Sequence, residues 1–280
     1  MEKNILLLTL KNIEGIGNIT AKRIMDSIGN KKIELEELFK IIQNFPRVKI
    51  NNFEVLNEAH NEAIKLLENI KESSIEMITY FDLDYPKSFL SLKDLPVILF
   101  YEGDIRLAFQ KCATIVGTRK PSEEGRVVAY NLSKKLSKKY VIVSGLAEGI
   151  DIEAHKACIG NKGKTIAILG QGINTMDHKK NNDLCEKIIT SGGLILSEYP
   201  PEQVASNYTF IARDRLQSAL SEKVFVIESS IDGGTMHAAM KAREYNKELR
   251  VFKSKNTDYI LPSGNSLLIQ EGAKTFDEDY

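Results

Sequence analysis

Short β-rich segments alternate with amphipathic helical stretches from residue 76 to the end of the chain, and this alternation predicts an α/β fold. The β-rich segments lack a clear polar and apolar alternation, which indicates strands covered by helices on both faces of a sheet. Each such segment is followed by a helical one, as parallel β–α–β units require. We therefore expect a doubly wound, mostly parallel sheet, preceded by a small all-α N-terminal domain.

The small all-α domain is expected over residues 1–75. Apolar residues recur at helical spacing over residues 33–42 and 55–67. Before them, Gly15 and Gly17 precede an amphipathic stretch. This pattern is typical of a helix-hairpin-helix or SAM-like domain, in which N–H groups at a helix start can meet a DNA phosphate. A glycine turn between packed structural helices would give the same pattern, so both interpretations stay open.

The larger domain is expected over residues 76–280, beginning with a connecting segment flanked by Pro86 and Pro96. The expected strands are residues 97–101, 113–116, 140–143, 165–169, 194–196, 224–227 and 249–252. Helices are expected at residues 123–138, 152–159, 182–191, 212–221 and 235–245. In this order, the carboxyl ends of the parallel strands lie at one edge of the sheet, and ligands bind at that edge in such sheets.

Composition sets limits on the class of protein. The chain has 280 residues, 42% of them hydrophobic, which is enough to bury a sizeable core. Its 38 basic and 38 acidic residues give a net charge of zero, which counts against a global basic field for nucleic acid. Phosphate contacts need only a local cluster of basic groups, however.

The cysteines and apolar runs predict a cytoplasmic protein. Cys112, Cys158 and Cys185 form no CxxC motif and suit small buried thiols in a reducing compartment. No apolar run is long enough to cross a bilayer, and no secretory signal pattern precedes the fold. We expect neither a metal site nor a cofactor.

Glycines cluster where expected strands give way to helices. Without a Cβ atom, glycine lets an anion approach backbone N–H groups, and a helix N-terminus adds a favourable partial charge. The glycines that we expect to bind phosphate in this way are Gly117, Gly145, Gly149, Gly233 and Gly234, together with Thr235. No GxGxxG or GxxxxGK[ST] motif occurs, which disfavours a dinucleotide-dependent dehydrogenase and a P-loop NTPase.

Basic residues accompany these loops. Arg119 follows the glycine after one strand, Lys179 lies in the third loop, and Arg213 and Arg215 lie at an expected helix start. Converging from separate loops, they would form a local basic site for phosphates. An isolated Lys or Arg is more often a solvated surface charge. The glycine loops and the helix start favour phosphate binding for the three arginines.

Two acidic positions and a histidine invite a catalytic interpretation. Asp151 and His155 are four residues apart on an expected helix, so they share one face and could act as a base. No nucleophile accompanies them in a recognisable motif. Asp151 could instead cap its helix, with His155 hydrogen-bonded in the crevice. Glu228 ends a strand and could accept a hydrogen bond from a sugar hydroxyl or cap the next helix. We assign no catalytic residue.

The loops together resemble the DNA-processing protein family DprA, also called Smf. The resemblance is carried by IVGTR, VSGLAEGIDIEAH, GKTIAILGQGI, LILSEYPP and FIARDRLQSALS, in consistent order over residues 80–273. It implies an extended Rossmann-like domain that binds and protects single-stranded DNA without hydrolysing it. It also implies a homodimer that loads the recombinase RecA during natural transformation.

The resemblance also implies roles for individual residues. Gly149, Asp151 and His155 would shape a loop and the helix behind it. Arg213 and Arg215 would be the paired arginines of an Arg-Asn-Arg segment. The residues that would line the pocket or face the phosphate are Arg119, Ser144, Gly145, Lys179, Asn181, Arg213 and Arg215.

Three segments depart from the family pattern. Asp214 replaces the asparagine between the paired arginines, and Asp177 and His178 replace a Tyr-Pro pair. The segment from Gly233 to Thr235 replaces a serine-glycine-serine type of sequence and resembles the phosphate loop of lysine-decarboxylase-like nucleotide hydrolases. An alternative function is therefore a nucleotide sensor or hydrolase, with Asp151 or Glu228 acting on the ribose. A partner-docking scaffold with a vestigial pocket is a third alternative.

Overall fold

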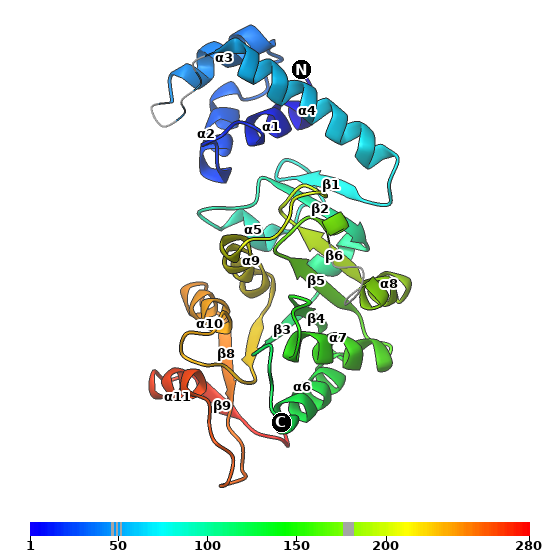
Figure 1. The fold of residues 1–280 in the computed structure, drawn as a ribbon, viewed down its shortest axis with the longest axis vertical. Helices are drawn as coiled ribbons and strands as arrows, with labels where there is room; N and C mark the ends of the chain where they lie inside the picture. The colour runs from blue at the N-terminus through cyan, green and yellow to red at the C-terminus, as the bar shows by residue number, and fades with distance from the viewer. Residues whose placement is uncertain (46–47, 49, 51, 176–181) are drawn as a thin grey trace. The chain divides into compact units, whose positions relative to one another are not determined.

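The computed structural model describes residues 1–45, 48, 50, 52–175 and 182–280 (Figure 1). The chain divides into two compact units: one is Met1–Tyr85 with Leu90–Leu99, and the other is Pro86–Phe89 with Phe100–Tyr280. The expected division between residues 75 and 76 falls inside the first unit and, as a domain boundary, stays a prediction. Across the described residues, no helix combines the length and apolar composition that crossing a bilayer requires.

In the described part of the first unit, helices α1 (Lys3–Lys11), α2 (Asn18–Ile28), α3 (Leu35–Gln43) and α4 (Phe53–Lys71) precede strand β1 (Glu76–Thr79). Several apolar positions at helical spacing are buried by the helices, among them Leu38, Leu56 and Ala63, whereas Val55 is exposed. In the turn before α2, Gly15 has φ +83°, a conformation that favours glycine, and Gly17 is the N-cap of α2. DNA contact by this turn stays a prediction.

The sheet is doubly wound and mostly parallel, as the sequence predicts. Its strand order is β1-β2-β6-β5-β4-β3-β7-β8-β9, with β2 antiparallel to β6 and the described pairs from β6 to β9 parallel. The remaining strands are β2 (Ile98–Gly103), β3 (Cys112–Val116), β4 (Val141–Ser144), β5 (Thr165–Leu169), β6 (Leu194–Ser197), β7 (Lys223–Val226), β8 (Glu248–Phe252) and β9 (Lys274–Phe276).

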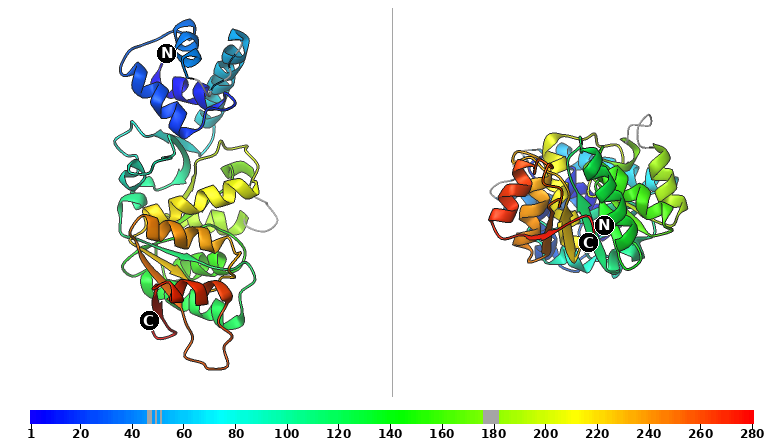
Figure 2. Two further views of the ribbon diagram at one scale, coloured as in Figure 1. Left: turned by 90° about the vertical axis from the view of Figure 1, so that its left-hand side faces the viewer. Right: turned by 90° about the horizontal axis from the view of Figure 1, so that it is seen from below.

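Helices cover the parallel part of this sheet on both faces (Figures 1 and 2). Side chains alternate along β3: Ala113 and Ile115 pack in the core beneath α6 and α7, whereas Val116 packs in the core beneath α10. One layer holds α6 (Glu123–Leu136), α7 (Ile150–Gly160) and α8 (Asn182–Thr190), and the other holds α9 (Asn207–Leu220), α10 (Thr235–Glu244) and α11 (Ser263–Gln270). The short helix α5 (Lys87–Leu90) precedes β2.

The strand order reverses at β3. From β3 the chain steps outward through β4, β5 and β6, then returns to place β7 on the other side of β3. The loops that follow β3 and β7 therefore leave the sheet in different directions, and an open α/β sheet has its ligand crevice at such a point. The glycine-rich loops identified in the sequence lie at this carboxyl edge.

Asn265 in α11 holds the ends of two strands together. Its fully buried amide nitrogen donates to the carbonyl oxygens of Ile227 (2.7 Å) and Phe252 (3.0 Å), and its oxygen accepts from the backbone N–H of Ser229 (2.8 Å).

We expect Asn265→Ala to lower the free energy of unfolding by about 3 kcal/mol, because three buried groups lose their partner. Urea unfolding measures this change. Ser266→Ala, its half-buried neighbour, is the control, and equal stability of the two variants would contradict the prediction.

Candidate nucleic-acid interface

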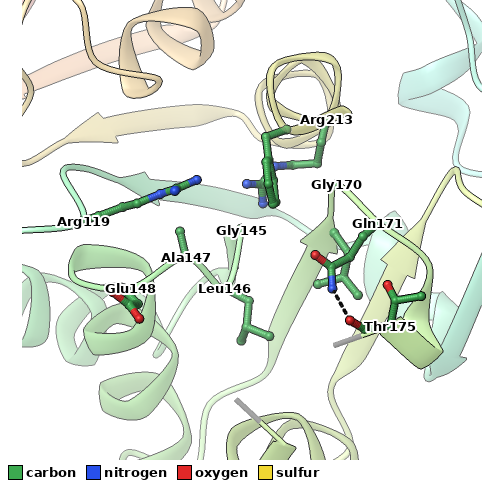
Figure 3. A pocket seen from close by; sticks show the side chains of 11 residues that line it. Arg119, Gly145, Leu146, Ala147, Glu148, Gly170, Gln171, Thr175 and Arg213 are labelled. Atoms are coloured by element: carbon green, nitrogen blue, oxygen red, sulfur yellow. Dashed lines mark hydrogen bonds between the residues drawn. The ribbon is translucent and has the colours of Figure 1, made fainter. Parts of the chain in front are cut away.

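Two cavities lie side by side at the carboxyl edge of the sheet, with volumes of about 370 Å³ and 360 Å³. They share Arg119, Ala147, Phe210 and Arg213. We call the first the groove cavity; its other lining residues are Gly145, Leu146, Glu148, Leu169, Gly170, Gln171 and Thr175 (Figure 3). We call the second the crevice cavity; it lies at the switch between β3 and β7, and its lining includes Gly117, Thr118, Lys120, Asp151, Asp214, Gln217, Ser229, Ser230, Gly233, Gly234 and Thr235.

Arg213 is a buried cation between the two cavities. Its Nη1 donates to the carbonyl oxygen of Ile168 (2.6 Å). In the amide orientation that satisfies both donors, the side-chain oxygen of Gln217 accepts from Nη1 (3.0 Å) and from the N–H of Gly145 (2.8 Å). A Cβ atom on Gly145 would overlap the guanidinium group, so glycine is needed there to admit Arg213. The predicted glycine loop thus makes room for an arginine side chain.

Arg119 is exposed, and its guanidinium extends toward that of Arg213 across the groove cavity (Figure 3). Its guanidinium carbon lies 5.4 Å from the ring centroid of Phe210, within the range of a cation–π contact. Arg119 has no ion pair within the part of the chain that the structure describes. Two positive groups and one aromatic face therefore meet where the cavities join.

Sequence reasoning missed Phe210. The ring is half-buried, and Gly170 leaves space for it, since a Cβ on Gly170 would lie 2.8 Å from a ring carbon. The expected helix began at residue 212, too late to include Phe210. In α9, which begins at Asn207, Phe210 precedes Arg213 by three residues, so both side chains share one face. An aromatic residue beside a basic one is a common platform for stacking bases.

Asp151 supports the loop between β4 and α7. Its Oδ2 accepts from the backbone N–H groups of Gly145 (3.0 Å) and Ala147 (3.3 Å). Burial raises the pKa of this carboxyl, while Arg213 and the two N–H groups oppose the rise. The expectation that Asp151 caps its helix is wrong: Gly149 is the N-cap of α7, and the carboxylate reaches back to the loop instead.

His155 is a fully buried neutral side chain. Its Nδ1 lies 2.7 Å from Oγ1 of Thr165, which donates its own hydrogen to the carbonyl oxygen of Ile142 (2.7 Å). Because that hydroxyl hydrogen is already used, Nδ1 of His155 carries the proton and donates it to Oγ1 of Thr165. Burial and the nearby charge of Arg213 lower its pKa to about 3. Asp151 lines the crevice cavity with its carboxylate bound by the loop, whereas His155 is in the lining of neither cavity.

Asp214 places a carboxylate in the wall of the crevice cavity. Its side chain is 13% exposed, and Oδ1 lies 3.1 Å from Nε of Arg213, too poorly aligned for a hydrogen bond. Burial raises its pKa to about 6, and the charge of Asp151 adds to the rise, whereas Arg213 and Arg119 oppose it. An acid that titrates close to neutral pH therefore faces the arginines.

The structure brings together many of the residues that the sequence singled out. Gly117, Arg119, Gly145, Arg213, Gly233, Gly234 and Thr235 line one or both cavities. Lys179 and Asn181, with Asp177 and His178, lie outside the described residues.

Three other residues do not line the cavities as expected. Ser144 is fully buried, and its hydroxyl donates to the carbonyl oxygen of Ile115 (2.7 Å). Gly149 packs against backbone atoms of Thr118, which a Cβ atom would contact at 2.5 Å. Arg215 points away: its guanidinium donates to both carboxylate oxygens of Glu198, at 3.0 and 2.7 Å. Helix geometry explains the last case, because residues two apart face different sides.

Glu228 anchors the start of α6. Its carboxylate accepts from the N–H of Ser122 (2.9 Å) and from the hydroxyls of Ser122 (2.5 Å) and Tyr259 (2.6 Å). Ser122 is in turn the N-cap of α6, so the acid holds the capping residue in place. Glu228 lies outside the lining of both cavities, and its contacts favour the structural alternative.

Comparisons with known proteins agree with this geometry. Residues 76–279 match the family model described as DNA recombination-mediator protein A. DNA processing protein DprA of Bacillus subtilis is 34% identical over 240 residues, which cover 84% of this chain and 80% of that protein. The X-ray structure of DprA from Streptococcus pneumoniae superposes with a TM-score of 0.82 at 29% identity, covering 98% of this chain and 95% of the other.

A second solved structure is that of Helicobacter pylori DNA processing protein A, reported for its single-stranded DNA binding mode. It matches with a TM-score of 0.65 at 30% identity, covering 73% of this chain and 92% of that one. The family match covers most of the chain and includes both cavities. The chain therefore belongs to the DNA recombination-mediator protein A family, the DprA/Smf proteins.

Proposed function

We propose that this protein binds single-stranded DNA along the groove and crevice cavities. The observation that carries the proposal is the junction of Arg119, Arg213 and Phe210: two guanidinium groups extend toward each other beside an aromatic face. Guanidinium groups bind phosphate oxygens, and aromatic rings stack on bases of any sequence. The binding of single-stranded DNA by the Helicobacter pylori relative supports the proposal.

A local basic site compensates for the zero net charge. Arg119, Lys120 and Arg213 line the crevice cavity, and two of them also line the groove cavity. Phosphate binding depends on such local charge rather than on the charge of the whole protein.

We expect affinity for oligo-dT to fall steeply with salt and to vary little with sequence. Anisotropy titrations of oligo-dT and a mixed-sequence strand test this, and salt-independent or absent binding would contradict it.

Phe210 supplies the stacking surface in this proposal. We expect Phe210→Ala to weaken oligo-dT binding about tenfold, because base stacking on an aromatic side chain contributes about 1–3 kcal/mol per base. Tyr208→Ala is the matched control, since Tyr208 is 77% exposed in the same helix and lines neither cavity. Equal losses in the two variants, measured by anisotropy, would remove Phe210 from the binding site.

The proposed role is binding rather than catalysis. Asp151 is engaged by the backbone of its loop, and His155 is buried and neutral, which supports a structural role for both.

We further propose that the protein protects incoming DNA and passes it to RecA as a homodimer, in natural transformation and recombination. The family's description as a recombination mediator supports this part. Three free, buried cysteines support a cytoplasmic site of action.

A nucleotide sensor or hydrolase is the second candidate. Gly233, Gly234 and Thr235 line the crevice cavity at the start of α10, which is where a nucleotide phosphate would bind. Calorimetry with nucleoside monophosphates and cyclic dinucleotides, set against oligo-dT, separates the two functions. Tight mononucleotide binding without an oligo-dT signal would favour the second.

A further inference from the structure

The crevice cavity contains hydrogen-bond donors that the protein leaves unused. At the start of α10, the N–H of Met236 donates to the carbonyl oxygen of Gly233, and the N–H of His237 donates to the carbonyl oxygen of Gly234, both at 3.0 Å. The N–H groups of Gly234 and Thr235 and the hydroxyl of Thr235 donate to no acceptor in the described ranges. A Cβ on Gly234 would meet nothing within 4 Å, so the space before these donors is open.

A buried cation faces the same cavity. The side chain of Arg213 is only 6% exposed, and its Nε, which lies 3.1 Å from Oδ1 of Asp214, makes no hydrogen bond to the residues that the structure describes. Arg119 and Lys120, both exposed, line the cavity from the loop after β3. Donors therefore converge from three elements that are distant in sequence, which one helix N-terminus alone would not provide.

The donors in this cavity suit one terminal phosphate better than a continuing backbone. A phosphomonoester carries close to two negative charges and three terminal oxygens, enough to use donors from all three elements. The carboxylates of Asp214 and Asp151 lie in the same lining and oppose any phosphate, so the cations and N–H groups must outweigh them. A volume of about 360 Å³ is at the lower end of the range for small-ligand pockets, a size suited to a single nucleotide.

We propose that the crevice cavity binds the terminal phosphate of a nucleotide, which places a phosphorylated end of a DNA strand there while the strand continues into the groove cavity. This inference rests on the proposed DNA binding. The same chemistry is available from a free mononucleotide, so the test distinguishes the two sources. The ligand class is a phosphomonoester attached to a nucleoside.

The test compares oligo-dT carrying a 5′-phosphate, a 3′-phosphate or two hydroxyl ends, by competition anisotropy. A terminal phosphate at one end should raise affinity about tenfold over the hydroxyl-ended strand, as expected for hydrogen bonds to a charged group. The end that gives this increase is the end that the cavity holds. Equal affinities for all three strands would overturn the proposal while leaving DNA binding intact.

Two variants locate the effect. Gly234→Pro deletes one N–H, and proline accepts the φ of −54° found there; Thr235→Val deletes the hydroxyl with little change of shape. Each should reduce the preference for a terminal phosphate severalfold, a larger change than any loss in binding of the hydroxyl-ended strand. Gln171→Ala in the groove cavity is the control and should leave the preference unchanged. A preference that survives in both variants would overturn the proposal.

Deoxythymidine monophosphate and thymidine separate the remaining cases. If the monophosphate binds where thymidine does not, and if Gly234→Pro weakens that binding, the free nucleotide is a ligand of the same cavity. If no oligonucleotide binds, the proposed function fails, and this mononucleotide comparison alone decides the cavity's chemistry. Absence of both oligonucleotide preference and monophosphate binding overturns the inference.

Discussion

Replacing Asp214 with asparagine should strengthen oligo-dT binding about tenfold at pH 8 and remove most of its dependence on pH. The wild-type carboxylate lies 3.1 Å from Nε of Arg213 in the wall of the crevice cavity, where it opposes a phosphate. Removing one negative charge a few ångströms from a bound phosphate is worth about 1–2 kcal/mol in a partly buried site. Asparagine keeps the shape of the side chain and removes the charge.

The sign of the pH dependence follows from the raised pKa of Asp214, about 6. Above pH 6 the carboxyl is ionised and repels phosphate; below pH 6 it is protonated and the repulsion is lost. Wild-type affinity should therefore rise as pH falls from 8 to 5, with proton uptake on binding. The groups that face this carboxyl are Arg213, Asp151 and Arg119.

Anisotropy titrations across this pH range measure the effect of Asp214→Asn. Asp258→Asn is the control, because it removes the same charge at an exposed position outside both cavities. The control should keep the wild-type profile. Superimposable pH profiles for Asp214→Asn and the wild-type protein would show that Asp214 does not act on the ligand.

Reversing the charge of Arg119 should have the larger effect, a loss of at least about a hundredfold in oligo-dT affinity. Arg119 lines both cavities and contacts the ring of Phe210, so Arg119→Glu removes a phosphate ligand and a cation–π contact together. It also places a new carboxylate against the phosphate. Losing a charge-assisted bond and gaining repulsion costs about 3 kcal/mol or more.

The fold should tolerate this change, because Arg119 is exposed and a substitution at such a position changes stability by about 0.5 kcal/mol or less. Lys138→Glu, an equally exposed charge reversal after α6, should weaken binding only slightly. Circular dichroism checks that both variants are folded. Equal affinities of the two variants would mean that the loss reflects net charge and not the site.

The sequence predicted the sheet well because hydrophobic strands followed by glycine turns and amphipathic helices are local signals. It missed the last helix and strand for a physical reason. Strand β9 has only three residues, and α11 begins with Ser263 and Gly264, which are weak helix formers. Both depend on tertiary contacts such as the three hydrogen bonds of Asn265, which no local pattern reveals.

The site was predicted in part, for a related reason. Loop glycines and Arg119 and Arg213 follow from strand order, since the carboxyl ends of parallel strands share an edge. The pairing of Arg215 with Glu198 joins α9 to the end of β6 and has no local signature. The raised pKa of Asp214 has no local signature either, because it depends on how deeply the side chain is buried.

In the proposed complex, single-stranded DNA lies against the junction of Arg119, Phe210 and Arg213. Photocrosslinking of oligo-dT that contains bromodeoxyuridine, followed by peptide mapping, locates the strand directly. We predict crosslinks in the α9 peptide that contains Phe210 and in the loop from Gly145 to Glu148. Crosslinks confined to residues 1–75, with none at the two cavities, would contradict the account.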